Sequence, residues 1–484
     1  MASLSQLAGR GALLGSAGQF GKLAINLASL VILARMLSPH DYGLLAMVTA
    51  VIGVAELIRD MGLSTAALQA KTLSFEERNN LWWANTGLGV LCSIGAASLA
   101  PLLAWVYNEP DVLTITLCLS LVFTISGAAT QYRTDLTRNL QMGKIAAIDL
   151  LSGLCSLIGA IYIAHIGGGY WALVFQQVST NLLALLCLSY AAKWLPRFYD
   201  RTVSIQHFFK FGFPIFGSSL LTYWASNLDT TLVGKFFGTV SLGYYNRGMQ
   251  VIRLPMNQIR NPLTSVAIST LSKVQDDEER FNNYVTKAQV AFLYPITLIS
   301  LWIAATAQDT IPLLLGVEWS QVIPLVIIFA VGDAISNLSS AGGWVYLSKG
   351  KSYALLQYTV ISTVTRIVLF CIMVPFGLYA IASVYAIAPT FLWPLSLYIC
   401  YRATGYSTKR LFFTSLRIII SCGIALLTTL YVGYYVIPGS GIIHLMITSF
   451  VYLSAFSIVI LLVPIMRQDF LNAINTLRNS IKSN

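Results

Sequence analysis

Charged side chains are scarce in this sequence. Asp, Glu, Lys and Arg make up 10% of the 484 residues, whereas 56% of the residues are hydrophobic. Soluble globular domains carry about a quarter charged residues, which they need to cover the surface that faces water. The shortage therefore excludes an ordinary water-soluble protein and predicts a chain that lies mostly within a lipid bilayer.

Motifs for metal, disulfide or nucleotide chemistry are also missing. The seven cysteines stand singly, with no C-x-x-C pair and no histidine at metal-ligand spacing, and the chain has no P-loop. The longest expected outward segment, about 307–320, is too short to hold a catalytic Ser, His and Asp. The absence of these motifs predicts a protein that is not an enzyme, binds no metal or organic cofactor and hydrolyses no ATP.

Apolar segments long enough to cross a bilayer, about 20 residues each, follow one another along the chain. Fourteen of them predict fourteen transmembrane helices and hence an all-α polytopic membrane protein. The segments lie near 12–34, 42–62, 81–106, 112–132, 145–165, 170–192, 211–234, 242–268, 288–306, 321–347, 354–374, 379–400, 411–436 and 442–466.

The basic residues indicate the orientation. An even number of helices places both termini on one side of the membrane. If that side is the cytoplasm, it carries twenty-one Lys and Arg, against only Arg35 and Lys235 on the other side. Because cytoplasmic loops are enriched in Lys and Arg, we expect both termini to be cytoplasmic. The formal charge of +11 is then mainly an orientation signal, and no nucleic-acid partner is expected.

A weak internal repeat is visible. Segments 33–43 and 233–243 align at an offset of 200, with Arg35 on Lys235 and a glycine on a glycine at their last position. Both copies begin at the cytoplasmic side and span six helices, and such parallel repeats imply a pseudo-two-fold axis along the membrane normal. We predict six-helix lobes at 1–200 and 201–403, two additional helices at 404–470 and a cytoplasmic tail at 471–484.

Ionisable residues inside transmembrane helices are costly and usually face a bundle interior or a wet cavity. Polar residues recur at three- and four-residue spacing on the first two helices of each predicted lobe, so they share a helix face. Their cations predict an anion-binding cavity, and salt bridges with nearby acidic residues stay an alternative. The cavity candidates are Lys22, Asn26, Arg59, Arg253, Asn257, Arg260 and Arg366.

Three further positions lie outside this pattern. Asp333 and Arg366 each fall near the middle of a predicted helix, so they either pair with each other or one of them faces the cavity. His444 lies near the start of the last predicted helix and has no ligand partner in the sequence, so we interpret it as a membrane-interface residue.

Several stretches, in order and spacing, resemble Wzx-type polysaccharide flippases of the MOP superfamily. The resemblance covers most of residues 10–400 and is nearest the colanic-acid and teichuronic-acid exporter branch of the polysaccharide transporter family. Ser269 departs from the pattern, since relatives often have Pro there. The stretches are LARMLSPHDYGLL at 33–45, DMGL at 60–63, EERNNLWWANTGLGVL at 76–91, Asn227 to Tyr245, LSKVQDD at 271–277 and LGVEW at 315–319.

The resemblance implies two lobes around a central cavity that opens alternately to each side. It also implies the cargo, an undecaprenyl-diphosphate-linked oligosaccharide repeat unit that is moved from the cytoplasmic to the outer leaflet for surface polysaccharide biosynthesis. A diphosphate headgroup needs fixed cations, which agrees with the cavity candidates. A proton or sodium gradient is expected to drive transport through acidic residues. The candidates for coupling are Glu56, Asp60, Asp229 and Asp333.

By the same resemblance we expect a monomer in the bacterial cytoplasmic (inner) membrane. Its partners are the lipid-linked oligosaccharide, membrane lipids and the polysaccharide polymerase and chain-length machinery. Two alternatives stay open. A drug/cation antiporter of the same superfamily is disfavoured by seven basic against five acidic residues inside the predicted helices. A membrane-embedded polysaccharide polymerase or ligase needs the large outward loop that this sequence lacks.

Overall fold

The computed structural model describes residues 4–70 and 73–482, with backbone only at some positions, among them 4–17. All regular elements in this described part are helical. The chain forms two compact units, Met1–Asn246 and Arg247–Asn484. The all-α fold predicted from the sequence is therefore confirmed.

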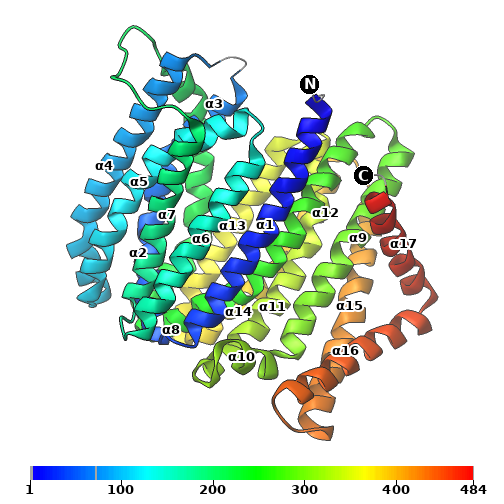
Figure 1. Cartoon of the computed structure of the whole chain (residues 1–484). Helices are drawn as coiled ribbons and strands as arrows, with labels where there is room; N and C mark the ends of the chain where they lie inside the picture. Colours follow the sequence, from blue (N-terminus) through cyan, green and yellow to red (C-terminus); the bar gives the residue numbers. More distant parts are fainter. Residues whose placement is uncertain (1–3, 71–72, 483–484) are drawn as a thin grey trace. The chain divides into compact units, whose positions relative to one another are not determined.

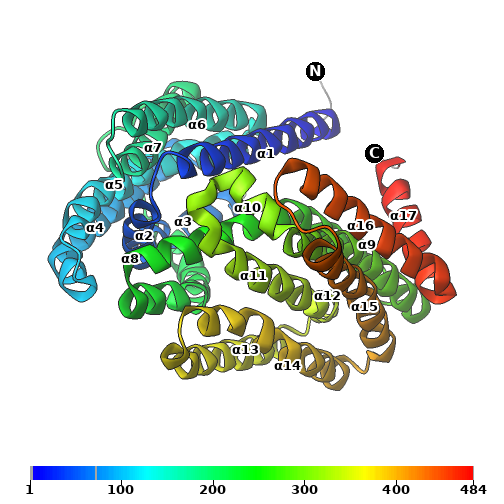
Figure 2. The same ribbon diagram turned by 90° about the horizontal axis from the view of Figure 1, so that it is seen from below.

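The described residues of the first unit form seven helices and the beginning of an eighth, which are labelled in Figure 1. In Figures 1 and 2, α1 lies against α6, and α4 and α5 run side by side. The helices are α1 (Leu4–Ala34), α2 (Pro39–Asp60), α3 (Leu63–Gln69), α4 (Phe75–Tyr107), α5 (Asp111–Arg138), α6 (Met142–His165), α7 (Trp171–Ala192) and the first part of α8 (Gln206–Lys273).

Local sequence explains where α2 and α4 begin. Ser38 and Asp41 bond reciprocally to each other's backbone N–H at the start of α2, and Ser74 and Glu77 do the same at the start of α4. Each pair is a capping box, which satisfies backbone donors that the first helical turn leaves without partners. Pro39 is the first residue of α2, and its ring restricts the backbone angle φ to a value that suits the first helical turn.

Helix α8 is a hairpin of two helices. Gly238 alone within it has a non-helical conformation, with φ 78° and ψ −178°. Tyr245 Oη donates to Asp229 Oδ2 at 2.7 Å. In a straight helix these residues would be about 24 Å apart along the axis, so the chain reverses at Gly238. The two arms correspond to the predicted helices 211–234 and 242–268.

The two copies of the weak repeat touch each other inside the first unit. A Cβ atom added to Gly43 would lie 1.8 Å from Thr239 O, and one added to Gly243 would lie 1.9 Å from Pro39 O. The contact is reciprocal, because residue 43 meets 239 while residue 243 meets 39. Two copies related by a two-fold axis contact each other in this way. The geometry agrees with the predicted repeat, whereas the predicted domain boundaries stay a prediction.

The second unit begins in the second arm of α8 and contains α9 to α17. In Figure 2, α13 and α14 lie side by side. The remaining elements are α9 (Glu278–Ala305), α10 (Ala307–Leu315), the 3₁₀ helix η1 (Val317–Val322), α11 (Ile323–Ser336), the 3₁₀ turn η2 (Asn337–Ser339), α12 (Ser340–Ser348), α13 (Ser352–Met373), the 3₁₀ turn η3 (Val374–Phe376), α14 (Leu378–Thr404), α15 (Lys409–Tyr431), the π turn η4 (Val432–Val436), α16 (Ile442–Leu462) and α17 (Pro464–Lys482).

Membrane-spanning length is common among these helices. Eleven helices within the described residues are long and apolar enough to cross a membrane, and each coincides with a predicted segment. This agreement confirms a multi-pass membrane protein, while the total of fourteen and the two-lobe arrangement stay predictions. One expectation is wrong: segment 307–320 is not a loop but forms α10 and most of η1, and Trp319 is fully buried there.

Candidate functional site

A polar cavity of about 590 Å³ lies within the first unit. Residues from α2, α3, α5, α7 and the first arm of α8 line it, and three of them, Glu56, Arg59 and Asp60, are predicted site residues. Arg133 contributes a fourth charged side chain. Two acidic and two basic side chains therefore face this cavity, so its wall has mixed charge where the sequence predicted a cationic one.

The charged side chains of this cavity differ in how they are held. Arg59 Nη1 donates to Thr130 Oγ1 at 2.9 Å, while its buried Nε has no hydrogen-bond partner among the described residues. Arg133 forms two hydrogen bonds to Asp149, of 2.5 and 3.1 Å. Such bidentate pairs are geometrically fixed. Arg59 therefore keeps a free donor, whereas Arg133 is already neutralised by its partner.

Lys22 and Asn26 do not line this cavity. Gly18 and Gly21 face α6, because Cβ atoms added there would fall within 2.6 Å of Ala146 and Leu150 side chains. That packing leaves Lys22 and Asn26 exposed on another face of α1. Within the described part of the chain, neither side chain has a hydrogen bond or ion pair. The structure thus separates them from Glu56, Arg59 and Asp60.

A partly buried charge network lies in the second unit. Arg260 Nη2 is 2.5 Å from Asp333 Oδ1, and Asp333 Oδ2 accepts hydrogen bonds from Ser300 Oγ and Asn337 Nδ2, both at 3.1 Å. The donors come from α8, from α9 and from the turn η2 that follows α11, and together they hold both carboxylate oxygens of Asp333. Asn257 Oδ1 accepts a long bond, 3.4 Å, from Arg260 Nη1.

Arg253, Asn257 and Arg260 share one face of α8, as their spacing of four and three residues predicts. Arg253 is exposed, and its Nη2 donates to Tyr385 Oη on α14 at 3.2 Å. Among the described residues this is its one hydrogen bond. The face therefore presents a guanidinium whose other donors are available to an anion.

Asp333 does not pair with Arg366. Arg260 occupies its Oδ1, and α14 packs against both α11, which carries Asp333, and α13, which carries Arg366. Within the described residues Arg366 has no hydrogen bond or ion pair, and only 6% of the apolar part of α13 is buried. Asp229, another predicted coupling residue, is buried in the α8 hairpin beside Tyr245.

Sequence reasoning missed one buried pair and misplaced His444. His444 is not an interface residue, because only 7% of it is exposed and its Nδ1 lies 2.7 Å from Asp309 Oδ2. Asp309 fell in the segment that we expected to be an outward loop. Ala307, Ile311 and Leu315 are buried at the four-residue spacing of a helix face, but Asp309 is buried outside that spacing, so periodicity gave no signal for it. No group of three His, Cys, Asp or Glu side chains in the described residues is placed to hold a metal ion.

Apolar helices with charged side chains held between them define the class as a multi-pass membrane protein, and solved structures share its fold. The lipid II flippase MurJ in an inward closed conformation superposes with a TM-score of 0.74 at 14% identity, over 92% of this chain and 98% of that one. An inward-facing multidrug resistance MATE family transporter of the MOP superfamily gives 0.58 at 12% identity, over 80% and 96%.

The family follows from the sequence pattern of polysaccharide biosynthesis proteins, which matches residues 32–324. The chain belongs to this family, and the resemblance to Wzx-type flippases is confirmed. Relatives include lipopolysaccharide biosynthesis protein WzxC of Escherichia coli (strain K12), 25% identical over 70% of each chain, and teichuronic acid biosynthesis protein TuaB of Bacillus subtilis (strain 168), 26% identical over 62% of each chain. The chain is accordingly a transport protein and not an enzyme.

Proposed function

We propose that the protein flips an undecaprenyl-diphosphate-linked oligosaccharide repeat unit from the cytoplasmic to the outer leaflet by alternating access. Relatives are named for lipopolysaccharide and teichuronic acid biosynthesis, and one is the succinoglycan biosynthesis transport protein ExoT of Rhizobium meliloti. The likeness to a lipid II flippase supports the fold needed for this task. The observation that carries the proposal is the α8 face with Arg253, Asn257 and Arg260.

This face suits a diphosphate. Arg253 has donors to spare, and the buried Nε of Arg260 has no hydrogen-bond partner among the described residues. Guanidinium groups bind phosphate oxygens through two parallel hydrogen bonds, which fix both distance and orientation. The asparagine amide between the two arginines can donate to a bridging oxygen or a sugar hydroxyl. The apolar lipid chain needs no protein charge and stays in the bilayer.

Energy coupling follows from the pairing of Arg260. Arg260 cannot satisfy both Asp333 and a cargo phosphate with the same nitrogen atoms. If cargo draws Arg260 away, the partly buried carboxylate of Asp333 loses its cation, and an uncompensated charge there is unfavourable. Binding a proton at Asp333 removes that cost. We therefore assign Asp333 as the coupling residue and a proton as the coupling ion, with no other cofactor.

In the same proposal the protein is a monomer of the bacterial cytoplasmic (inner) membrane with both termini in the cytoplasm. It delivers its cargo to a polysaccharide polymerase and chain-length machinery on the outer side. Basic residues at the expected cytoplasmic loops support this orientation.

The test is to replace Arg253 by Ala in a strain that lacks the native gene. Surface polysaccharide should fall about tenfold or more, since loss of one charged hydrogen bond removes more than about 1.4 kcal/mol of binding. Lipid-linked repeat units should accumulate on the inner leaflet. Arg402→Ala, at an exposed arginine near the end of α14, is the matched control. Normal export by Arg253→Ala at normal membrane expression would contradict the proposal.

A further inference from the structure

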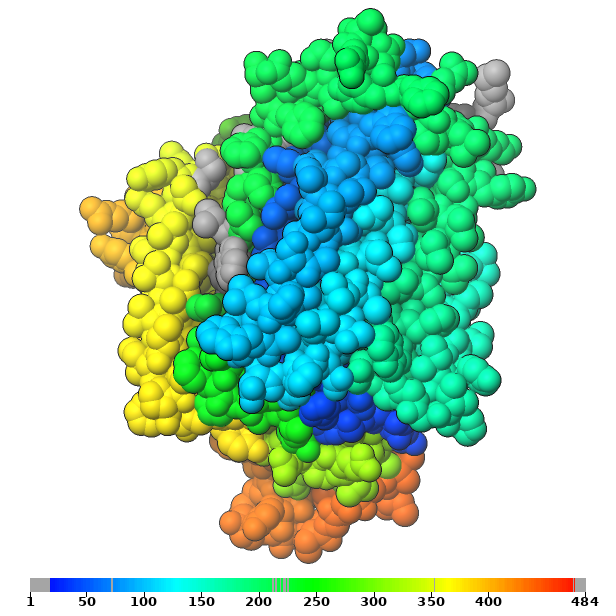
Figure 3. Space-filling model, turned by 90° about the vertical axis from the view of Figure 1, so that its left-hand side faces the viewer, coloured from blue at the N-terminus to red at the C-terminus, as the bar shows by residue number. Residues whose placement is uncertain are grey.

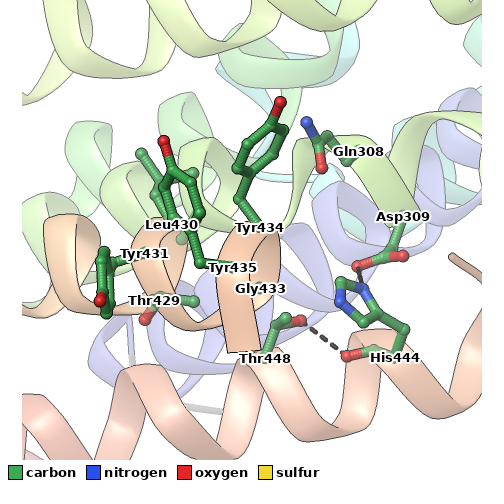
Figure 4. A pocket seen from close by; sticks show the side chains of 11 residues that line it. Gln308, Asp309, Thr429, Leu430, Tyr431, Gly433, Tyr434, Tyr435, His444 and Thr448 are labelled. Carbon is green, nitrogen blue, oxygen red and sulfur yellow. Dashed lines mark hydrogen bonds and ion pairs between the residues drawn. The ribbon is translucent and has the colours of Figure 1, made fainter. Parts of the chain in front are cut away.

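A second cavity, of about 340 Å³, lies entirely within the second unit, between α10, η4 and the start of α16 (Figure 4). Asp309 and His444 face each other in its wall, and tyrosines from the end of α15 and from η4 line the opposite part. Asp309 is 2% and His444 7% exposed. Nothing in the proposed function uses this pair.

The hydrogen bonds of the pair fix its number of protons. His444 Nδ1 lies 2.7 Å from Asp309 Oδ2, and His444 Nε2 lies 2.9 Å from Ile437 O. A carbonyl oxygen only accepts, so Nε2 must carry a proton. The Nδ1 to Oδ2 contact also needs one proton between its two atoms. The pair therefore holds two protons, either as imidazolium and carboxylate or as imidazole and carboxylic acid.

The same bonds fasten a short segment of chain to α10. Residues 437–441 connect η4 to α16, and both ends of this connection meet the pair. Ile437 O accepts from His444, and Gly441 N donates to Asp309 Oδ1 at 3.1 Å. Gly441 has φ 109°, a conformation that favours glycine, so the backbone there is shaped to deliver its N–H.

Losing one proton breaks this arrangement. Either Nε2 then faces Ile437 O, or Nδ1 faces the carboxylate, with two lone pairs opposed and one hydrogen bond lost. The pair also acquires a net negative charge in a buried place. The lining residues from α9, α10, α15, η4 and α16 include no Lys, Arg or Glu, and the other titratable groups are Tyr431, Tyr434 and Tyr435. Nothing in the described wall compensates for the charge.

We propose that Asp309 and His444 form a proton-binding latch. With two protons bound, the pair holds residues 437–441 against α10. When the pH rises and one proton leaves, the segment is released and the cavity opens. The latch therefore opens in the direction of rising pH, and pH 5.5 and pH 8.5 bracket the range in which imidazole side chains ordinarily titrate. This inference stands independently of the proposed cargo.

Hydrogen–deuterium exchange of the purified protein in lipid nanodiscs tests the latch without any transport assay. The measured quantity is the protection factor of the Gly441 amide, corrected for the intrinsic pH dependence of exchange, at pH 5.5 and pH 8.5. In the wild-type protein it should fall at least about tenfold at the higher pH, as one hydrogen bond and its neighbour are lost.

Two variants should separate the states. The carboxamide of Asp309→Asn donates to Nδ1 of a neutral imidazole and still accepts from Gly441, so protection should stay high at both pH values. His444→Ala should be unprotected at both. His165→Gln, at an exposed histidine at the end of α6, is the control and should follow the wild type.

Equal wild-type protection at pH 5.5 and pH 8.5 would overturn the latch, as would an Asp309→Asn protein that loses protection like the wild type. Should the variants fold poorly, nitrogen NMR of the labelled imidazoles decides from the wild type alone, because the chain has four histidines. The nitrogen signals of one buried imidazole should change between the two pH values, because the proton that Nδ1 shares with Asp309 leaves. Unchanged signals of that imidazole contradict the proposal.

Discussion

Two adjacent buried asparagines near the start of α4 hold the segment between α7 and α8. Asn80 is fully buried, and its Nδ2 donates to Asp200 O at 2.7 Å and to Val203 O at 3.0 Å, while its Oδ1 accepts from Asp200 N. Asn79 Nδ2 likewise donates to Phe198 O, and its Oδ1 accepts from Arg197 N. Figure 3 shows this segment, in green, over the start of α4. A side-chain amide thus replaces the backbone partners that an irregular segment lacks.

Asn80→Ala should therefore destabilise the protein by about 1–3 kcal/mol, because it leaves buried backbone groups without partners. The melting temperature of the purified protein in detergent should fall by about 2 °C or more. Asn283→Ala is the control, since that asparagine is exposed and makes no side-chain hydrogen bond within the described residues. Equal melting temperatures for the two variants would refute the role of Asn80.

At the residue scale, the sequence identifies polar residues but not their partners. Periodicity correctly placed Arg253, Asn257 and Arg260 on one face, because spacing along a helix depends on local geometry alone. The pairing of Asp333 with Arg260 and not with Arg366 depends on which helices are neighbours. That information lies in the packing of α14 against α11 and α13, and no local pattern contains it.

At the element scale, the reciprocal contact of Gly43 and Gly243 gives a sharper test of the repeat. Both glycines face a backbone carbonyl at a distance that no Cβ can adopt. Gly43→Ala and Gly243→Ala should each cost about 1–3 kcal/mol through overpacking. Because both substitutions force apart the same two segments, the double variant should cost less than the sum of the single ones.

The measurement is the yield of monodisperse protein and its melting temperature. Gly87→Ala is the control, since its added Cβ would meet nothing within 4 Å. Strictly additive losses would show that the two glycines belong to separate contacts. Aligning the two copies of the repeat suggests this contact only weakly, because a single matching glycine carries little information. The chain reversal at Gly238, which the alignment does not show, brings the two copies together.

At the scale of the whole molecule, composition and hydropathy predict more of the fold than any single motif does. Long apolar segments can be satisfied in lipid only as helices, so the all-α fold and eleven of the spans were predictable. The structure of segment 307–320 was not predictable, because its helices are too short to cross a membrane and its burial depends on neighbours such as α9 and α16. The pair of Asp309 and His444 was missed for the same reason.

The coupling of transport to a gradient is the prediction for the whole molecule. Asp333→Asn removes the negative charge that competes with cargo for Arg260, so cargo binding no longer requires a proton to enter. In proteoliposomes the variant should bind the lipid-linked diphosphate more tightly and flip it at a rate that an imposed proton gradient does not change. Wild-type flipping should rise with the gradient.

The control is Asp469→Asn, which breaks the Arg417 pair. The side chains of that pair are 28% and 15% exposed, against 30% and 14% for Arg260 and Asp333, so both substitutions disturb similar surroundings. Asp469→Asn should keep the gradient dependence of the wild type. If Asp333→Asn also keeps it, the exchange of Arg260 between carboxylate and phosphate is wrong, and the coupling proton binds elsewhere. Glu56 would then be the next candidate, because it lines the cavity of the first unit and has no hydrogen bond among the described residues.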